Sequence, residues 1–153
     1  MRGSRVLTVC LLVLVVMALP GPASASRSRV QAVSSMLGTI NQARARNGLR
    51  PLHASPALNG SASRFAGSLM SRGVLAHRSR VSADSGFSRL GEALGLISGR
   101  GLGVRSTVSL WLHSPPHRLV ILTRSMNLIG VGMARGRFHG RRSTIWVVQT
   151  GRR

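Results

Sequence analysis

Residues 127–150 read NLIGVGMARGRFHGRRSTIWVVQT. Apolar residues alternate with other residues through 127–134 and again through 144–150, which is the pattern of two strands with one face buried. The segment between them is basic and contains glycine, as is common in a connecting loop. The sequence therefore predicts a β-hairpin near the C-terminus.

Three segments upstream of the hairpin repeat apolar residues at helical spacing. The first runs from residue 30 to a stop at Asn47-Gly48. The second begins at Ser55-Pro56, an N-cap followed by proline, and ends at Gly73. The third, over residues 104–111, stops at Ser114-Pro115-Pro116, and a further turn is expected to begin near His117. Each helix has one apolar face, so each must pack against another element.

A further strand is expected over residues 89–97, where Leu90, Glu92, Leu94 and Leu96 share one face. Helical segments combined with mostly sequential strands predict an α/β fold, in which a small, mainly antiparallel sheet is covered by helices.

The first 25 residues have the organisation of a signal peptide: Arg2 and Arg5, an apolar run over 6–19, and then Ala23-Ser24-Ala25. The apolar run is shorter than the roughly 20 residues that span a bilayer. We therefore predict export with cleavage near Ala25-Ser26, a short leader over 26–35, one domain over 36–151, and membrane contact only through the signal. An uncleaved anchor is the alternative.

Cysteine usage and charge exclude several classes of protein. Cys10 lies in the predicted signal, so the mature chain has no disulfide, thiolate nucleophile or zinc–thiolate site. All 22 basic residues are arginines, opposed only by Asp84 and Glu92, and loss of Arg2 and Arg5 lowers the net charge from +20 to +18. This charge favours anionic cell-envelope polymers as partners, although a codon preference for arginine is an alternative explanation. Aromatic residues are only 3% of the chain, which argues against specific nucleic-acid binding.

Two motifs can be set aside. The glycines at 99, 101 and 103 do not complete a dinucleotide-binding fingerprint. Residue 106, where a further glycine is needed, is Ser, and no acidic residue follows Glu92. His113 and His117 have the spacing of two metal ligands on one helix face, but Pro115-Pro116 prevents one helix from carrying both. His53 and His139 lie in polar segments and are expected to be solvated.

Glu92 is the most informative single residue, because it is the only glutamate and lies in an apolar strand. A buried carboxylate needs a partner. An arginine is one candidate. The other candidates are His77, which follows the second helix, and His117, which a helix N-terminus should keep neutral. Two neutral histidines and a carboxylate would form an open site for zinc or another divalent metal, but spacing alone does not bring the three together.

The chain resembles the CAP superfamily in its bacterial, SCP-like form. The resemblance covers roughly residues 36–151, and its strength lies in the order of several short motifs. These are Ile40-Asn41-Gln42-Ala43-Arg44, Asn47-Gly48-Leu49-Arg50-Pro51-Leu52, Ser55-Pro56-Ala57-Leu58, Met70-Ser71-Arg72-Gly73, Ala76-His77, Gly91-Glu92, Trp111-Leu112-His113-Ser114-Pro115-Pro116-His117-Arg118 and Ile129-Gly130-Val131-Gly132.

The resemblance implies an α-β-α sandwich with a cleft lined by His77, Glu92 and His117. It also implies zinc or another divalent metal on His77 and His117, with Glu92 as a third candidate ligand. Members of the family bind lipids, sterols or glycans, and most have no established catalysis. Three departures weaken a metal site and weaken catalysis more: Ala93 replaces an asparagine, Ser114 a second glutamate and Pro116 a glycine.

We therefore predict a secreted, non-enzymatic binding module with a His/Glu cleft for a metal, small molecule, lipid or glycan. Two alternatives stay open. One is a metal-dependent hydrolase of peptides or cell-wall material, in which Glu92 is the only candidate catalytic residue. The other is a cationic adhesin that binds anionic surface polymers.

Overall fold

The computed structural model describes residues 22–78 and 86–153. The predicted signal peptide up to residue 21, and Asp84, lie outside the described residues. The elements in chain order are α1 (Pro22–Arg46), β1 (His53–Ala54), α2 (Pro56–Arg72), β2 (Arg89–Ser98), α3 (Val104–His113), α4 (Pro115–Leu122), β3 (Leu128–Phe138) and β4 (Arg141–Arg152).

The four strands form one sheet in the order β1-β3-β4-β2. β3 and β4 form the predicted hairpin, and β2 pairs antiparallel with β4, so that β2 is an edge strand. β1 pairs in parallel with β3 through His53 and Leu128. Sequence periodicity did not indicate β1, because two residues are too few to show a period. The predicted α/β fold with a mainly antiparallel sheet is confirmed.

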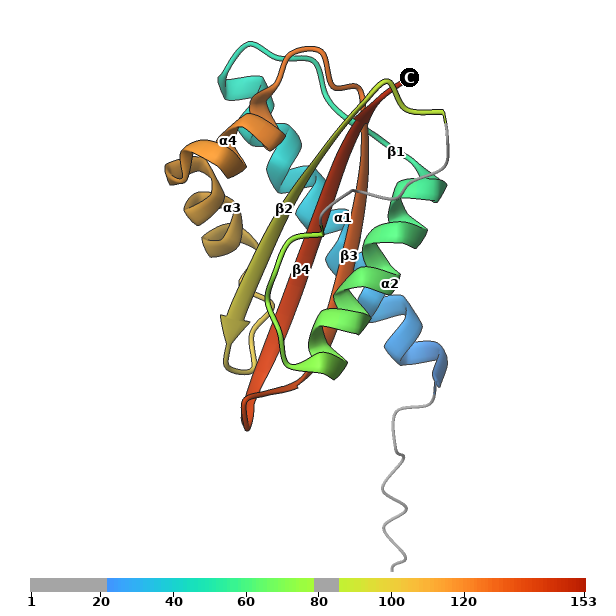
Figure 1. Cartoon of the computed structure of the whole chain (residues 1–153), viewed down its shortest axis with the longest axis vertical. Coiled ribbons are helices and arrows are strands. Elements are labelled where there is room, and N and C mark those ends of the chain that lie inside the picture. Colours follow the sequence, from blue (N-terminus) through green and yellow to red (C-terminus); the bar gives the residue numbers. More distant parts are fainter. Residues whose placement is uncertain (1–21, 79–85) are drawn as a thin grey trace, which may run out of the picture.

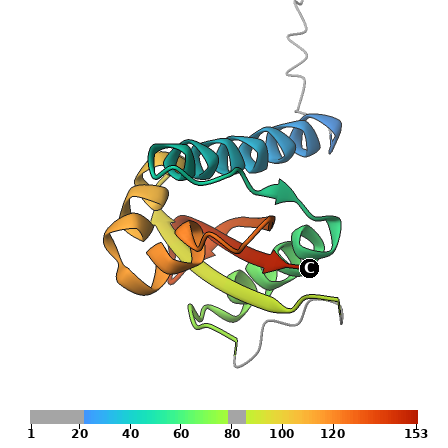
Figure 2. The ribbon, with the colours of Figure 1, turned by 90° about the horizontal axis from the view of Figure 1, so that it is seen from above.

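The helices form a layer on each side of the sheet. Figures 1 and 2 show α1 and α2 on opposite faces of the sheet, with α3 and α4 beside β2. The larger apolar cluster joins α1, α3 and α4 to one face, and a smaller cluster joins α2 to the other. Alternation along β2 divides its residues between the two, since Ala93 belongs to the first cluster and Leu94 to the second.

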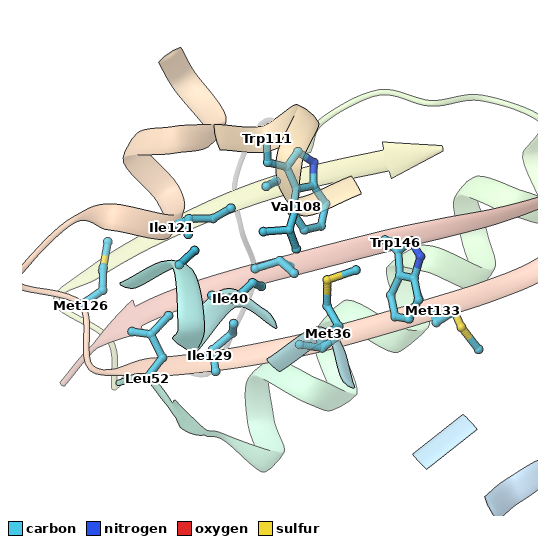
Figure 3. Packing of buried hydrophobic residues seen from close by; sticks show 14 of the residues in the cluster. Met36, Ile40, Leu52, Val108, Trp111, Ile121, Met126, Ile129, Met133 and Trp146 are labelled. Carbon is cyan, nitrogen blue, oxygen red and sulfur yellow. The ribbon is translucent and has the colours of Figure 1, made fainter. Parts of the chain in front are cut away.

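Two tryptophans are central to the larger cluster (Figure 3). Trp111 on α3 and Trp146 on β4 are almost fully buried. Their indole N–H groups donate to the carbonyls of Leu94 and Leu102, each at 2.7 Å. Each tryptophan therefore fills the core and satisfies its polar atom.

The local signals for the helix ends are also confirmed. The Ser55 hydroxyl accepts a hydrogen bond from Leu58 N–H at 3.4 Å, and Pro56 opens α2. α2 ends at Gly73, whose φ of 64° is left-handed. Gly48 has the same φ after α1.

Residues 26–35, the predicted leader, belong to α1, which begins before residue 30, where periodicity predicts the first helix to start. This segment is rich in serine and arginine, but one face of it is apolar and packs on the core. Ala32 and Met36 are buried and Val33 packs against the same cluster, while Val30 is exposed. Contact with the core from Ala32 onward stabilises the predicted helix, which continues N-terminally beyond residue 30.

α2 lies directly on the backbone of β3. A Cβ on Gly130 would overlap Leu58, and a Cβ on Gly132 would overlap the backbone of Ala62. Asn59, on the same helix, accepts a hydrogen bond from Val131 N–H through its side-chain oxygen at 2.8 Å. Absence of a side chain at the two glycines therefore sets how closely helix and sheet approach.

We expect Gly132→Ala to destabilise the fold by about 3 kcal/mol, because the atoms it meets belong to a backbone that cannot rotate away. For a domain of this size that corresponds to a Tm lower by about 10 °C in calorimetry. Gly67→Ala is the matched control, since nothing lies within 4 Å of a Cβ there and the position is helical. Equal Tm values for the two variants would contradict the close approach.

Arg44 is fully buried at the end of α1. Its guanidinium donates to the carbonyls of Arg50 at 2.8 Å, Ile121 at 2.6 Å, Thr123 at 3.2 Å and Met126 at 3.3 Å. The Ile121 and Thr123 carbonyls are at the C-terminal end of α4, which favours a cation. Burial lowers the pKa of Arg44. Arg44 thus ties α1 to the following loop and to α4.

Arg44→Lys should cost about 2–4 kcal/mol, because one ammonium group cannot reach carbonyls arranged around a planar fork. Chemical denaturation measures this loss, with Arg46→Lys, at an exposed position of the same helix, as the control. A destabilisation below about 0.5 kcal/mol would contradict the role assigned to the fork.

Candidate functional site

Glu92 lies on the edge strand β2, on the face covered by α2. Its side chain is only 4% exposed. The residue opposite it on β4 is Gln149, which is fully buried. The sheet register therefore places two polar side chains next to each other in an otherwise apolar layer.

Both carboxylate oxygens of Glu92 have a partner. Oε1 lies 3.2 Å from His77 Nδ1, and Oε2 accepts a hydrogen bond from Gln149 Nε2 at 3.0 Å. Within residues 22–78 and 86–153, the salt bridge of Glu92 is with His77 and not with an arginine. The interpretation of Glu92 as an arginine ion pair is therefore wrong for the described part of the chain.

His77 follows α2, beyond the left-handed turn at Gly73. His139 is exposed, as expected, and its Nε2 donates to the Gly73 carbonyl at 2.9 Å. The side chain of His77 is 52% exposed. A carboxylate next to Nδ1 favours the proton on that nitrogen, which leaves Nε2 as the nitrogen that can bind a ligand.

His117 reaches the same place from α4, where it stands in the first turn after Pro115 and Pro116. Its ring centroid lies 5.8 Å from that of His77, at an interplanar angle of 37°. Burial, and then the charge that His77 can carry, lower the pKa of His117 from its ordinary 6.5. Burial and the neighbouring His77 thus favour the expected neutral state of His117.

The three predicted residues converge, although not as a ready three-ligand set. Among the described residues, no group of three His, Cys, Asp or Glu side chains is arranged to hold a metal ion. His77 uses Nδ1 to contact Glu92, so the carboxylate orients an imidazole. Donors of these types nevertheless suit zinc, with two histidine nitrogens as ligands and Glu92 behind one of them.

Gln149 is the site residue that sequence reasoning missed. The signal was one long polar side chain among the buried residues of Ile145-Trp146-Val147-Val148 and Thr150. Its Oε1 has no hydrogen-bond partner within the described chain. Gln149 thus holds the Glu92 carboxylate through its amide nitrogen, and its amide oxygen stays an unpaired acceptor in the core.

His113 is outside this site. It ends α3, and its Nδ1 donates to the Ser109 carbonyl at 2.8 Å. The two prolines separate it from His117, as expected, because α3 and α4 are different helices.

A hollow of about 270 Å³ adjoins His117. β2 contributes its wall from Leu94 to Ile97, and α3 contributes Leu110 and Trp111. α3 packs closely against β2 beside the hollow, because Gly95 has no side chain. A Cβ at Gly95 would lie 2.6 Å from the Thr107 methyl group. His117 therefore borders a small, mainly apolar space.

The sequence matches the cysteine-rich secretory protein (CAP) family over residues 37–150. The chain belongs to this family, which confirms the resemblance drawn from its motifs. A comparison with curated proteins finds no match.

No helix within residues 22–78 and 86–153 is long and apolar enough to cross a bilayer.

Solved structures share the fold at low identity. An outer surface protein from Borrelia burgdorferi is 21% identical, with a TM-score of 0.64, over 80% of this chain and 93% of that one. An extracellular SCP-domain protein from Bacillus anthracis is 17% identical, with a TM-score of 0.67, over 89% of this chain and 45% of that one. A cysteine-rich secretory protein from Staphylococcus aureus is 17% identical, with a TM-score of 0.56, over 82% and 40% respectively.

The lowered pKa of His117 predicts a pH dependence of stability. Folded His117 binds a proton less readily than unfolded His117, so the free energy of unfolding should fall as pH drops through about 6.5 and go on falling to the lower pKa of the folded state. His117→Asn should flatten the dependence of Tm on pH between about 7.5 and 5 in metal-free buffer. His53→Asn, at an exposed position on β1, is the control. The same slope in wild type and His117→Asn would contradict the prediction.

Proposed function

We propose that the chain is an exported CAP-domain binding module, whose cleft of His77, Glu92, His117 and Gln149 holds a divalent metal, with zinc the best fit, next to a small ligand. Export is supported by the signal-like N-terminus and by relatives described as extracellular or outer-surface proteins. The cleft is supported by the described geometry of the four side chains.

The observation that carries the proposal is the partner of Glu92. Burial of a carboxylate is costly, and 22 arginines offer simple compensation. In the described structure the carboxylate instead pairs with a half-exposed histidine and a buried amide. A purely structural carboxylate has no need of an exposed imidazole, whereas a carboxylate that orients a ligand-binding imidazole does.

Zinc suits this arrangement for two reasons. His117 is kept neutral at neutral pH, the form in which imidazole binds a metal. Two histidine nitrogens also leave coordination positions for water or a ligand, as in open zinc sites. When bound, the metal would supply a Lewis acid, while the chain's own residues orient the imidazoles and form the apolar wall. An apolar part of a lipid or other small ligand would occupy the hollow next to His117.

Binding without catalysis is the function that this cleft supports best. Glu92 is the only carboxylate side chain among the described residues, and both its oxygens are engaged. General base catalysis by Glu92 would have to break the contact with His77 or with Gln149.

Zinc titration by calorimetry tests the proposal on the mature protein. We expect binding by the wild type, a loss of tenfold or more in His77→Ala and His117→Ala, and a loss of about 10- to 100-fold in Glu92→Gln, which removes charge behind a ligand. His113→Ala is the matched control and should bind as the wild type does. Equal heats for all five proteins, or no heat for the wild type, would refute the metal site.

A further inference from the structure

Four arginines gather at the end of the hairpin farthest from the His/Glu cleft. Arg100, Arg135, Arg137 and Arg142 line a pocket of about 450 Å³, together with Ser143. All four arginines are exposed. None of them takes part in the cleft, and nothing in the proposed function uses them.

The fold forces these charges together. Arg137 and Arg142 are direct partners across the β3–β4 hairpin. Arg100 comes from the loop after β2, which is fixed where Gly99 N–H donates to the Arg142 carbonyl at 2.7 Å. Like charges placed opposite each other on a sheet are destabilising. The arrangement therefore has a cost that an anion would remove.

Backbone contacts hold two of the guanidinium groups in place. Arg135 Nη2 donates to the Arg100 carbonyl at 2.8 Å, and Arg137 Nη1 donates to the Gly140 carbonyl at 2.8 Å. A guanidinium has five N–H donors, so one such bond orients the group and leaves other donors for a ligand. Ordering before binding reduces the entropy lost on binding.

No acidic side chain of the described residues compensates this charge. The only one is Glu92, and the register of β2 on β4 places it at the Gln149 end, with the Ser98–Ser143 pair at the pocket end. At about 3.3 Å per residue the separation is roughly 20 Å, which exceeds the Debye length of about 8 Å at physiological salt. Solvent ions screen Glu92 from the pocket.

We infer that this pocket binds phosphate oxyanions. The planar fork of arginine matches phosphate in a bidentate manner, and several forks around one hollow can bind a multiply charged group. Two sources share this chemistry: soluble phosphate polymers and the headgroups of an anionic bilayer. The inference does not rest on the proposed function of the His/Glu cleft, because the two sites share no residue and Glu92 is six residues along β2 from the Ser98–Ser143 pair.

The test compares two triple variants of equal net charge. Arg135→Gln/Arg137→Gln/Arg142→Gln removes charge from the pocket, and Arg46→Gln/Arg64→Gln/Arg105→Gln removes the same charge from exposed helix positions elsewhere. Calorimetry with inorganic polyphosphate should show a loss of about 100-fold or more for the pocket variant, since each lost charge-assisted bond costs about tenfold. The helix variant should stay within about threefold. Unchanged Tm in both shows that folding is intact.

Cosedimentation with vesicles of phosphatidylglycerol and phosphatidylcholine, against pure phosphatidylcholine, distinguishes the sources. If the pocket variant loses affinity for polyphosphate, the ligand is a soluble phosphate polymer. If it loses affinity only for anionic vesicles, the ligand is a lipid headgroup. Either result supports the inference. Equal loss in both triple variants, or no binding to either probe, overturns it. His77→Ala should bind both probes normally, so that failure here is distinguishable from failure of the metal cleft.

Discussion

Contact between α2 and the backbone of β3 is the constraint on which the rest of the structure depends. Gly130 and Gly132 present no Cβ, so Leu58 and Ala62 rest on the strand itself. This contact fixes the height of α2 above the sheet, and the left-handed Gly73 ends the helix. His77 follows this turn and contacts Glu92. The packing of α2 and its C-terminal turn together place a polar side chain at the sheet edge.

The two buried charges of known environment are satisfied in different ways. Arg44 is surrounded by four backbone carbonyls, two of them at the C-terminal end of α4, which compensate the guanidinium without a carboxylate. Glu92 is compensated by a histidine and an amide, without an arginine. Although the chain is very basic, no arginine of the described residues pairs with the Glu92 carboxylate, which can therefore orient the His77 imidazole. It is the physical reason for placing function at Glu92.

The antiparallel pair of β2 and β4 also carries two chemically different sites. Glu92 and Gln149 belong to the cleft, and the apolar hollow lies beside residues 94–97 of β2. Uncompensated arginines surround the hairpin beyond the Ser98–Ser143 pair. The roughly 20 Å between Glu92 and this pair exceeds the Debye length of about 8 Å, so solvent ions screen the two charged sites from each other. A metal or small ligand and an anionic polymer could therefore be bound independently.

The sequence by itself determined most of the fold, because its signals are local. The hairpin follows from alternation, and α2 from Ser55-Pro56 and Gly73. The family motifs placed His77, Glu92 and His117 in one site. Tertiary structure decided the rest: β1 forms because it pairs with β3, and α1 extends N-terminally of residue 30, where the sequence predicted the helix to begin. It also decided that Gln149 bonds to Glu92, which orients His77. The sequence did not predict this bond, because cross-strand register and burial are set by the whole fold and leave no mark in local periodicity.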